Sequence, residues 1–232
     1  MNFVKYHDVM ERFKGKSIAI VGSAPSCKDN DPEYVDSHDI VIRINNYKLI
    51  GSDGRGPSRR LRGTGRRTDV HYSFYGNSIK KRKDELARDG VRFCMCKCPD
   101  SKPVESPWHE KRGKTEGIDF RYIYRQRKDF WFCPTYIPET EKFLSYFRLM
   151  NNHVPTTGFS CILDVLGCDI RKAYITGFDF FTSSLHNVNE PWNSGNPSDP
   201  LRHVPLREAL WLKEALGNYP IELDSRLKEI LL

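Results

Sequence analysis

The chain has 232 residues, of which 38% are hydrophobic, so it can bury a sizeable core and is not a disordered chain. An excess of 37 Lys and Arg over 30 Asp and Glu gives a formal net charge of +7, which favours an anionic partner: nucleic acid, an acidic membrane surface or a phosphorylated substrate. Without a long apolar run or a signal-like N-terminus, and with an odd seven cysteines, we expect a soluble, cytoplasmic protein.

Short apolar runs alternate with helical patterns in the first hundred residues. A helical spacing over 2–14 precedes the apolar run Ser17–Val21, which ends at a glycine and predicts a buried parallel strand. Further strands are predicted at 39–44, 68–74 and 91–96, with a surface helix at 78–88. This alternation predicts an α/β fold, a doubly wound and mainly parallel sheet of the Rossmann-like kind.

The second half begins with segments of no clear period, a long connection at 99–117 and an aromatic, basic stretch at 118–132. Regular elements follow: a helix over 138–150, an apolar segment at 159–166, a strand at 172–176, a helix at 205–216, a strand at 219–223 and a terminal helix. The Ser-, Asn- and Pro-rich stretch 181–202 predicts a long, lid-like loop. With no second boundary, residues 1–232 are predicted to form a single domain.

Three cysteines alternate along Cys94, Cys96 and Cys98 and raise the question of a metal site. The spacing is not the CxxC of zinc sites, and no second ligand pair follows at finger spacing. A cysteine-rich buried strand is the favoured interpretation, and no metal site is predicted.

Four polar or glycine-containing turns follow predicted strands or open a predicted helix: 22–26, 45–46, 155–158 and 177–179. Ligands of an open parallel sheet bind beyond the carboxyl ends of its strands, where such turns meet. Neither the GxGxxG fingerprint nor a Walker loop is present. Each turn alone could simply end a strand or cap a helix. The four together favour a nucleotide-type ligand.

These segments resemble the sialylmotifs of sialyltransferases. IAIVGSAPS at 18–26 with VIRIN at 41–45 resembles the large motif, and PTTG at 155–158 with YITGFD at 174–179 resembles the small one. His203 and Glu208 have the H-x4-E spacing of the very short motif. The three motifs occur in the same order as in the family. Their GxxPS and GFDF forms look closer to bacterial sialyltransferases and motility-associated transferases than to the animal enzymes.

The resemblance implies transfer of a sialic acid from CMP-sialic acid to a glycan hydroxyl, with inversion and without a metal ion or other cofactor. His203 corresponds to the general base, since an imidazole with an ordinary pKa of about 6.5 can take the acceptor proton. Glu208 would assist it if the helix start allows, and His186 in the loop could neutralise the departing phosphate. The donor-binding residues implied are Gly22, Ser23, Ala24, Asn45, Thr156, Thr157, Gly158, Gly177, Phe178 and Asp179.

The sequence departs from the family at two places. Bacterial members carry a tyrosine where this chain has Phe181, and 182–202 holds no tyrosine, so another group would have to stabilise the leaving phosphate. Animal members join the two larger motifs by a disulfide. Cys168 matches one of its cysteines, but Ile18 stands in place of the other, so that bond cannot form.

The basic loop 52–67 contains six arginines between Arg55 and Arg67 and almost no apolar residues, which predicts a mobile surface loop. Without a groove reader or interleaved aromatic residues, no nucleic acid is expected. Capture of an anionic donor or acceptor, or peripheral docking on an anionic membrane that carries a lipid-linked acceptor glycan, fits better. Two alternatives to sialyl transfer stay open: a CMP-Kdo-dependent transferase, and a non-catalytic protein that binds nucleotides or polyanions.

Overall fold

The computed structural model of the chain describes residues 3–47, 49, 64–74, 83–99, 132–182, 185–186, 190–191 and 203–232. Eight strands form one sheet in the order β1-β6-β5-β4-β3-β2-β7-β10, and every neighbouring pair is parallel. The strands are β1 Phe3–Val4, β2 Ser17–Val21, β3 Ile40–Ile44, β4 Val70–Ser73, β5 Phe93–Cys96, β6 Thr135–Tyr136, β7 Lys172–Thr176 and β10 Ile221–Leu223. The predicted α/β fold with a parallel sheet is confirmed.

Helices connect and cover these strands. They are α1 Tyr6–Phe13, η1 Pro25–Asp29, α2 Pro32–Asp36, α3 Lys83–Arg88, α6 Thr140–Leu149, α7 Thr157–Leu166, α8 Pro205–Ala215 and α9 Ser225–Leu231. A separate antiparallel pair joins β8 Leu185–His186 to β9 Glu190–Pro191. None of the described helices combines the length and apolar character needed to cross a bilayer.

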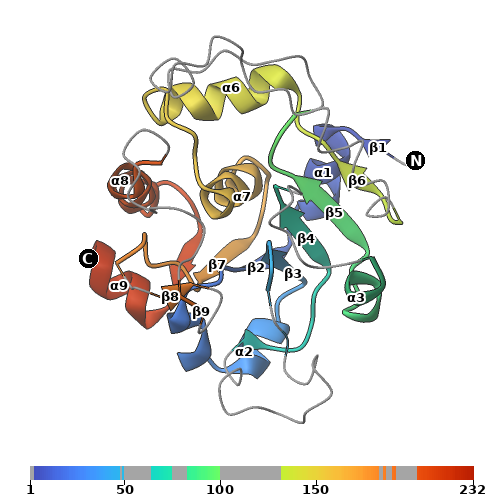
Figure 1. Ribbon diagram of the computed structural model, residues 1–232, viewed down its shortest axis with the longest axis horizontal. Helices are drawn as coiled ribbons and strands as arrows, with labels where there is room; N and C mark the ends of the chain where they lie inside the picture. The colour runs from blue at the N-terminus through green and yellow to red at the C-terminus, as the bar shows by residue number, and fades with distance from the viewer. Residues whose placement is uncertain are drawn as a thin grey trace.

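The sheet reverses its winding beside β2. From β2 the chain moves outward through β3, β4, β5 and β6 on one side, whereas β7 and β10 lie on the other (Figure 1). In open α/β sheets a ligand binds in the crevice outside the carboxyl ends of the strands at such a switch point. The fold thus places the turns after β2, β3 and β7 where a ligand is expected.

Strand β2 shows why the sheet is covered on both faces. All five of its residues are buried, with Ile18 and Ile20 packing in the cluster that includes residues of α1, α7, α8 and α9. Ala19 and Val21 pack on the opposite face, against residues of η1 and α2. Because successive side chains of a strand point to opposite faces, a continuous apolar run is the pattern of a doubly covered strand.

The main differences from the predicted elements lie in short segments. The helix predicted over 2–14 begins only at Tyr6, because Phe3 and Val4 pair with Thr135 and Tyr136 of β6 at the sheet edge. The sequence gives no periodic signal for β6, α2 or η1, each of five residues or fewer. The hairpin of β8 and β9 falls in the stretch predicted to be an irregular loop. The helix predicted at 78–88 is described only over Lys83–Arg88.

The cysteine-rich strand is confirmed. Cys94 and Cys96 lie in β5, and both pack with Cys98, Leu86 of α3 and Phe143 of α6 in one apolar cluster. Cys94 and Cys96 lie on the same face of β5 because every second side chain of a strand points to the same side of the sheet. The alternation CxCxC is therefore the pattern of one apolar face of β5.

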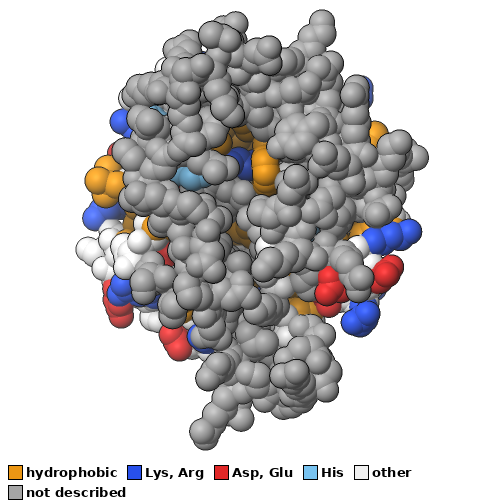
Figure 2. All heavy atoms as spheres, in the orientation of Figure 1, with side chains coloured by type: hydrophobic (Ala, Val, Ile, Leu, Met, Phe, Trp, Pro, Cys, Tyr) orange, Lys and Arg blue, Asp and Glu red, His pale blue; other side chains and the backbone are white. Residues whose placement is uncertain are grey.

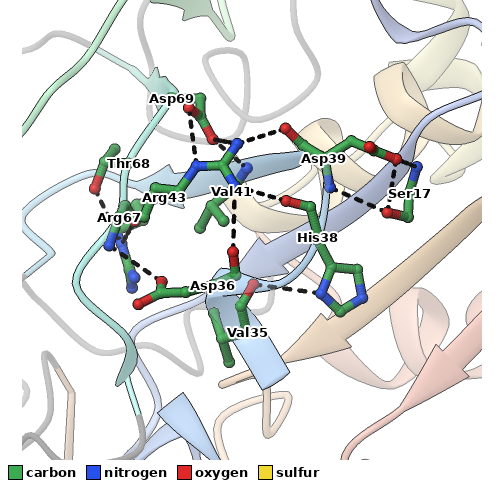
Figure 3. A network of polar contacts seen from close by, with 10 residues as sticks. All are labelled: Ser17, Val35, Asp36, His38, Asp39, Val41, Arg43, Arg67, Thr68 and Asp69. Carbon is green, nitrogen blue, oxygen red and sulfur yellow. Dashed lines mark hydrogen bonds and ion pairs between the residues drawn. The ribbon is translucent and has the colours of Figure 1, made fainter. Parts of the chain in front are cut away.

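Arg67 is fixed by several polar contacts, in contrast to the mobile loop predicted for this segment. Its guanidinium donates to the carbonyl oxygens of Asp36, His38 and Asp39, and it forms an ion pair with Asp69 at 2.9 Å (Figure 3). The carboxylate of Asp36 accepts hydrogen bonds from the backbone N–H groups of Arg66, at 2.7 Å, and Arg67, at 3.1 Å. The C-terminal end of the basic loop is thus fixed to α2, while its residues 52–63 lie outside the described part of the chain.

Charged side chains on the face in Figure 2 are interspersed rather than gathered by sign. Lys and Arg side chains of described residues alternate with Asp and Glu on both sides of this view. The net charge of +7 therefore does not form a single basic patch among the described residues visible on this face.

A buried carboxylate joins three elements on the α7 side of the sheet. Asp164 of α7 accepts hydrogen bonds from Tyr72 of β4 and Tyr146 of α6, both at 2.7 Å, and pairs with Lys142 of α6 at 3.2 Å. Burial raises the pKa of Asp164, although Lys142 and the two phenols act in the opposite direction. A buried carboxylate needs such partners. This network holds α6 on α7 and thereby fixes the chain that leads into the start of α7.

Candidate active site

A cleft lies at the carboxyl ends of β2, β3 and β7, where α7 begins. Twelve of the thirteen residues predicted from the sequence line it: Gly22, Ser23, Ala24, Asn45, Thr156, Thr157, Gly158, Gly177, Phe178, Asp179, His203 and Glu208. Ile44, Phe180 and Phe181 complete the lining. The thirteenth residue, His186, lies in β8, and its side chain is outside the described part of the structure, as is most of the predicted lid 181–202.

The turns after β2 and β7 interlock at the floor of this cleft. A Cβ atom added to Gly22 would lie 2.2 Å from the carbonyl oxygen of Gly177, closer than real contacts allow. The N–H of Ala24 donates to that same oxygen at 2.9 Å. Gly177 has a φ of +72°, a left-handed conformation that favours glycine. The two glycines therefore allow backbone to pack directly on backbone.

Asp224 fixes the second of these turns and was missed by the sequence analysis. One of its carboxylate oxygens accepts hydrogen bonds from Thr176 Oγ1 at 2.8 Å and the N–H of Gly177 at 3.0 Å. The other caps α9 through the N–H of Leu227. An Asp between a predicted strand and a predicted helix signals an N-cap, but its bonds to the turn after β7 depend on the tertiary fold.

The first residues of α7 face the cleft and are held by a carboxylate from α8. Thr156 caps α7 by accepting a hydrogen bond from the N–H of Phe159 at 3.1 Å. Glu208 accepts bonds from both the N–H and the hydroxyl of Thr156, each at 2.7 Å. Thr157 and Gly158 line the cleft at the positive end of the helix dipole. This end of α7 suits the carboxylate or phosphate of a donor.

Glu208 does not assist His203 in the way the spacing allowed. Helix α8 begins at Pro205, so His203 lies outside it and the two residues share no helical face. Both carboxylate oxygens of Glu208 bind Thr156 instead. Burial raises the pKa of Glu208 to about 7, against the opposing effects of the Thr156 bonds and of the charge of Lys97. Glu208 thus positions the start of α7.

His203 lines the cleft with a defined orientation. Its Nδ1 contacts the carbonyl oxygen of Val154, and a carbonyl can only accept, so Nδ1 carries the proton. In the neutral ring the lone pair is then on Nε2. A hydrogen bond that fixes one ring nitrogen as a donor leaves the other as the basic atom. The geometry can therefore supply a general base at Nε2.

The side-chain oxygen of Asn45 is engaged in hydrogen bonds within the protein. That oxygen accepts hydrogen bonds from Ser73 Oγ at 3.1 Å and from the N–H of Phe74 at 3.4 Å. Asn45 also has a φ of +52°, which asparagine tolerates better than most residues. The opposite end of the amide, its NH2 group, is the donor that a ligand in the cleft could use.

The turn after β7 places two phenylalanines in the cleft. Phe180 and Phe181 have φ values of +49° and +63°, an uncommon conformation for bulky residues. Asp179 holds this turn, because its Oδ1 accepts from the N–H of Phe181 at 3.0 Å. Phe178 packs against Gly158, where an added Cβ would lie 2.4 Å from its ring. Phenylalanine rings thus line the part of the cleft where the resemblance to bacterial sialyltransferases would place a tyrosine.

Solved structures of sialyltransferases are similar to this chain. The α-2,3-sialyltransferase Cst-I of Campylobacter jejuni has a TM-score of 0.59 at 14% identity, covering 94% of this chain and 79% of that one. CstII of the same organism, in complex with the substrate analogue CMP-3FNeuAc, has a TM-score of 0.52 at 13% identity, covering 90% and 80%. A mammalian sialyltransferase gives 0.51 at 16%, covering 90% and 68%. No family model matches the sequence, and no curated protein matches it significantly.

These observations define the fold of this chain as that of sialyltransferases. This chain has that fold, as its parallel sheet and the likeness to bacterial and mammalian sialyltransferases show. The twelve predicted residues that line its cleft lie at the switch point of the sheet, where open α/β sheets bind ligands.

Gly22→Ala tests the interlocked turns. The added Cβ would lie 2.2 Å from a backbone oxygen, so we expect the free energy of unfolding to fall by about 2 kcal/mol or more. Gly217→Ala is the matched control, because an added Cβ there meets nothing within 4 Å. Urea unfolding of both variants measures the difference. Equal stability of the two would contradict the close approach of the turns.

Glu208→Gln tests the buried carboxylate through pH. The pKa of Glu208 is raised in the folded protein to about 7, so the stability that the protonated form contributes is present at low pH and lost as the pH rises through 7. Glutamine keeps both contacts with Thr156 without ionising. We expect the variant to match the parent near pH 5 and to exceed it by about 2 kcal/mol at pH 8. A difference that does not change with pH would be inconsistent with a buried carboxylate of raised pKa.

Proposed function

We propose that this protein is an inverting glycosyltransferase that moves a sialic acid from CMP-sialic acid to a glycan hydroxyl. The observation that carries the proposal is the cleft itself. It combines the two interlocked turns, the start of α7 and an oriented imidazole at the switch point of a sialyltransferase fold. CstII was solved with CMP and with a CMP-sugar analogue, which supports the same donor class here.

The donor would lie with its nucleotide along the turns after β2, β3 and β7. Gly22, Ser23 and Asn45 are assigned to the CMP portion, with Gly22 allowing close approach of the ligand and Asn45 donating from its side-chain NH2 group. The carboxylate of Asp179 is assigned to the ribose hydroxyls. Thr157 and Gly158 at the start of α7 are assigned to the sugar carboxylate or the phosphate, since a helix N-terminus favours an anion.

The chemical step follows from this placement. The acceptor hydroxyl oxygen attacks the anomeric carbon and forms the new glycosidic bond, while the bond from that carbon to the phosphate oxygen breaks and CMP departs. The acceptor proton passes to Nε2 of His203, whose Nδ1 proton is held by Val154. Attack from the face opposite the phosphate inverts the anomeric centre. No step calls for a metal ion, as the resemblance implies.

The same cleft could accept a different acidic donor. CMP-Kdo, like CMP-sialic acid, presents a carboxylate beside the anomeric carbon, so the start of α7 does not distinguish the two. Phe180 and Phe181 favour a further alternative, a non-catalytic nucleotide-binding protein of this fold, because neither ring can donate a proton to a departing phosphate. The remaining candidates for stabilising the departing phosphate are the His186 side chain and an arginine.

The test combines ligand binding with turnover. In a thermal-shift series with CMP, CDP, UDP, NAD and a short DNA duplex, we expect stabilisation by CMP and not by DNA. Release of CMP from CMP-sialic acid and CMP-Kdo, measured with a panel of glycan acceptors, then separates the donors. CMP binding with no transfer from either donor would support the non-catalytic alternative. Binding of DNA without any response to CMP would contradict the proposal.

His203→Ala separates the base from the donor site. We expect CMP affinity to stay within about threefold, and the transfer rate to fall at least 100-fold, in line with the usual contribution of a general base. The matched control is His153→Ala. His153 lies in the connection between α6 and α7, and its Nδ1 also bonds backbone carbonyls, but it does not line the cleft. Transfer at the parent rate in His203→Ala would remove this residue from its role.

A further inference from the structure

Two thiols from neighbouring parts of the sheet lie close together on the side of β5 that bears the cysteine cluster. Cys94 of β5 and Cys133, two residues before β6, have their sulfur atoms 3.5 Å apart. They are 39 residues apart in sequence. Neither cysteine forms a disulfide in this structure, and Cys94 is buried whereas Cys133 is half-buried. An S–S bond of roughly 2 Å would require the sulfurs to approach by about 1.5 Å.

The local structure allows that approach. Cys133 lies just outside β6, and the pairing of β5 with β6 begins only at Cys94 and Thr135. The N–H of Cys94 bonds the carbonyl oxygen of Pro134 at 3.0 Å, which keeps the two backbones adjacent. Cys133 can therefore shift by rotation of its side chain and of the residues before the strand, without breaking the strand ladder.

Cys133 is the better nucleophile of the two. Its hydrogen bond with Cys94 lowers the pKa of its thiol, and the positive charge of Arg12 acts in the same direction, while burial opposes both. It is the only one of the seven cysteines that is not buried. Reactive cysteines are partly exposed and have stabilised thiolates, so a small oxidant would meet Cys133 first.

We propose that Cys94 and Cys133 form a reversible disulfide by exchange with a small-molecule disulfide such as oxidised glutathione. The Cys133 thiolate attacks one sulfur of the oxidant, forming a mixed disulfide and expelling one glutathione thiolate. Cys94 loses its proton to solvent and attacks the Cys133 sulfur, expelling the second glutathione. The protein loses two protons and two electrons, and the oxidant takes them up and is reduced to two thiols.

The bond would lie away from the donor cleft. Cys94 and Thr135 are in register near the amino ends of β5 and β6, whereas the cleft lies at the carboxyl ends of β2, β3 and β7. The disulfide would therefore close the chain between residues 94 and 133 into a loop and leave the turns after β2, β3 and β7 unchanged. This site does not rest on the proposed function.

The experiment exposes the reduced protein to glutathione buffers of stepwise increasing oxidised fraction. Acid quenching, alkylation and peptide mass spectrometry then identify the state of each thiol. We expect loss of two of the seven thiols, a cross-linked peptide pair containing Cys94 and Cys133, and recovery of both thiols with dithiothreitol. The Cys133→Ser variant should not form the cross-link. The matched control is Cys168→Ser, because Cys168 packs on the α7 side of the sheet, and this variant should still form the cross-link. CMP affinity should stay within twofold on oxidation.

Three outcomes would overturn the proposal. These are a folded protein that keeps seven thiols at every buffer composition, a Cys133 that stops at the mixed glutathione adduct, and a bond to Cys96 or Cys98 instead of Cys94. If Cys133→Ser fails to fold, Cys94→Ala replaces it, because this change keeps Cβ in the apolar cluster. If a folded Cys133→Ser or Cys94→Ala variant still loses two thiol hydrogens on oxidation, that result also contradicts the assignment.

Discussion

The structure depends on the direct contact of two backbone turns at the switch point of the sheet. Gly22 and Gly177 bring the turns after β2 and β7 within van der Waals contact, which any side chain at Gly22 would prevent. Because the central strands β2 and β7 are hydrogen-bonded along five residues each, their ends are fixed relative to each other. The cleft is thus built on paired central strands that fix the positions of its turns, as a preorganised binding site requires.

Two buried carboxylates extend this rigidity to the surrounding elements. Asp224 joins the turn after β7 to the start of α9, and Glu208 joins the start of α7 to α8. Each takes up backbone N–H groups that would otherwise be buried without a partner, and so offsets part of the cost of its own burial. The same arrangement orients the cleft residues. His203 is held separately, by the carbonyl of Val154.

The parallel sheet and the four turns at the cleft could be predicted from local patterns: apolar runs such as Ser17–Val21, and polar or glycine-containing turns at strand ends or the start of a helix. The roles of His203 and Glu208 came only from the resemblance to sialyltransferases. The sequence could not predict contacts set by tertiary packing. Glu208 binds Thr156, 52 residues away, and Asp224 binds Gly177, 47 residues away, with no sign in the spacing of either pair. Arg67 was assigned to a mobile loop from its charged neighbours, yet its carbonyl partners come from residues 36–39. The two-residue strands β1 and β6 are too short for periodicity to detect.

The central claim is that the interlocked turns and the start of α7 hold a CMP-sugar in reach of His203. A crystal structure with CMP and a non-transferable CMP-sugar tests it most directly. The account predicts cytosine and ribose along the turns at Gly22, Asn45 and Gly177, the sugar carboxylate or phosphate at the N–H groups of Thr157 and Gly158, and Nε2 of His203 facing the side of the anomeric carbon opposite the phosphate. A nucleotide bound elsewhere, or one bound in the cleft with His203 on the phosphate side, would contradict it.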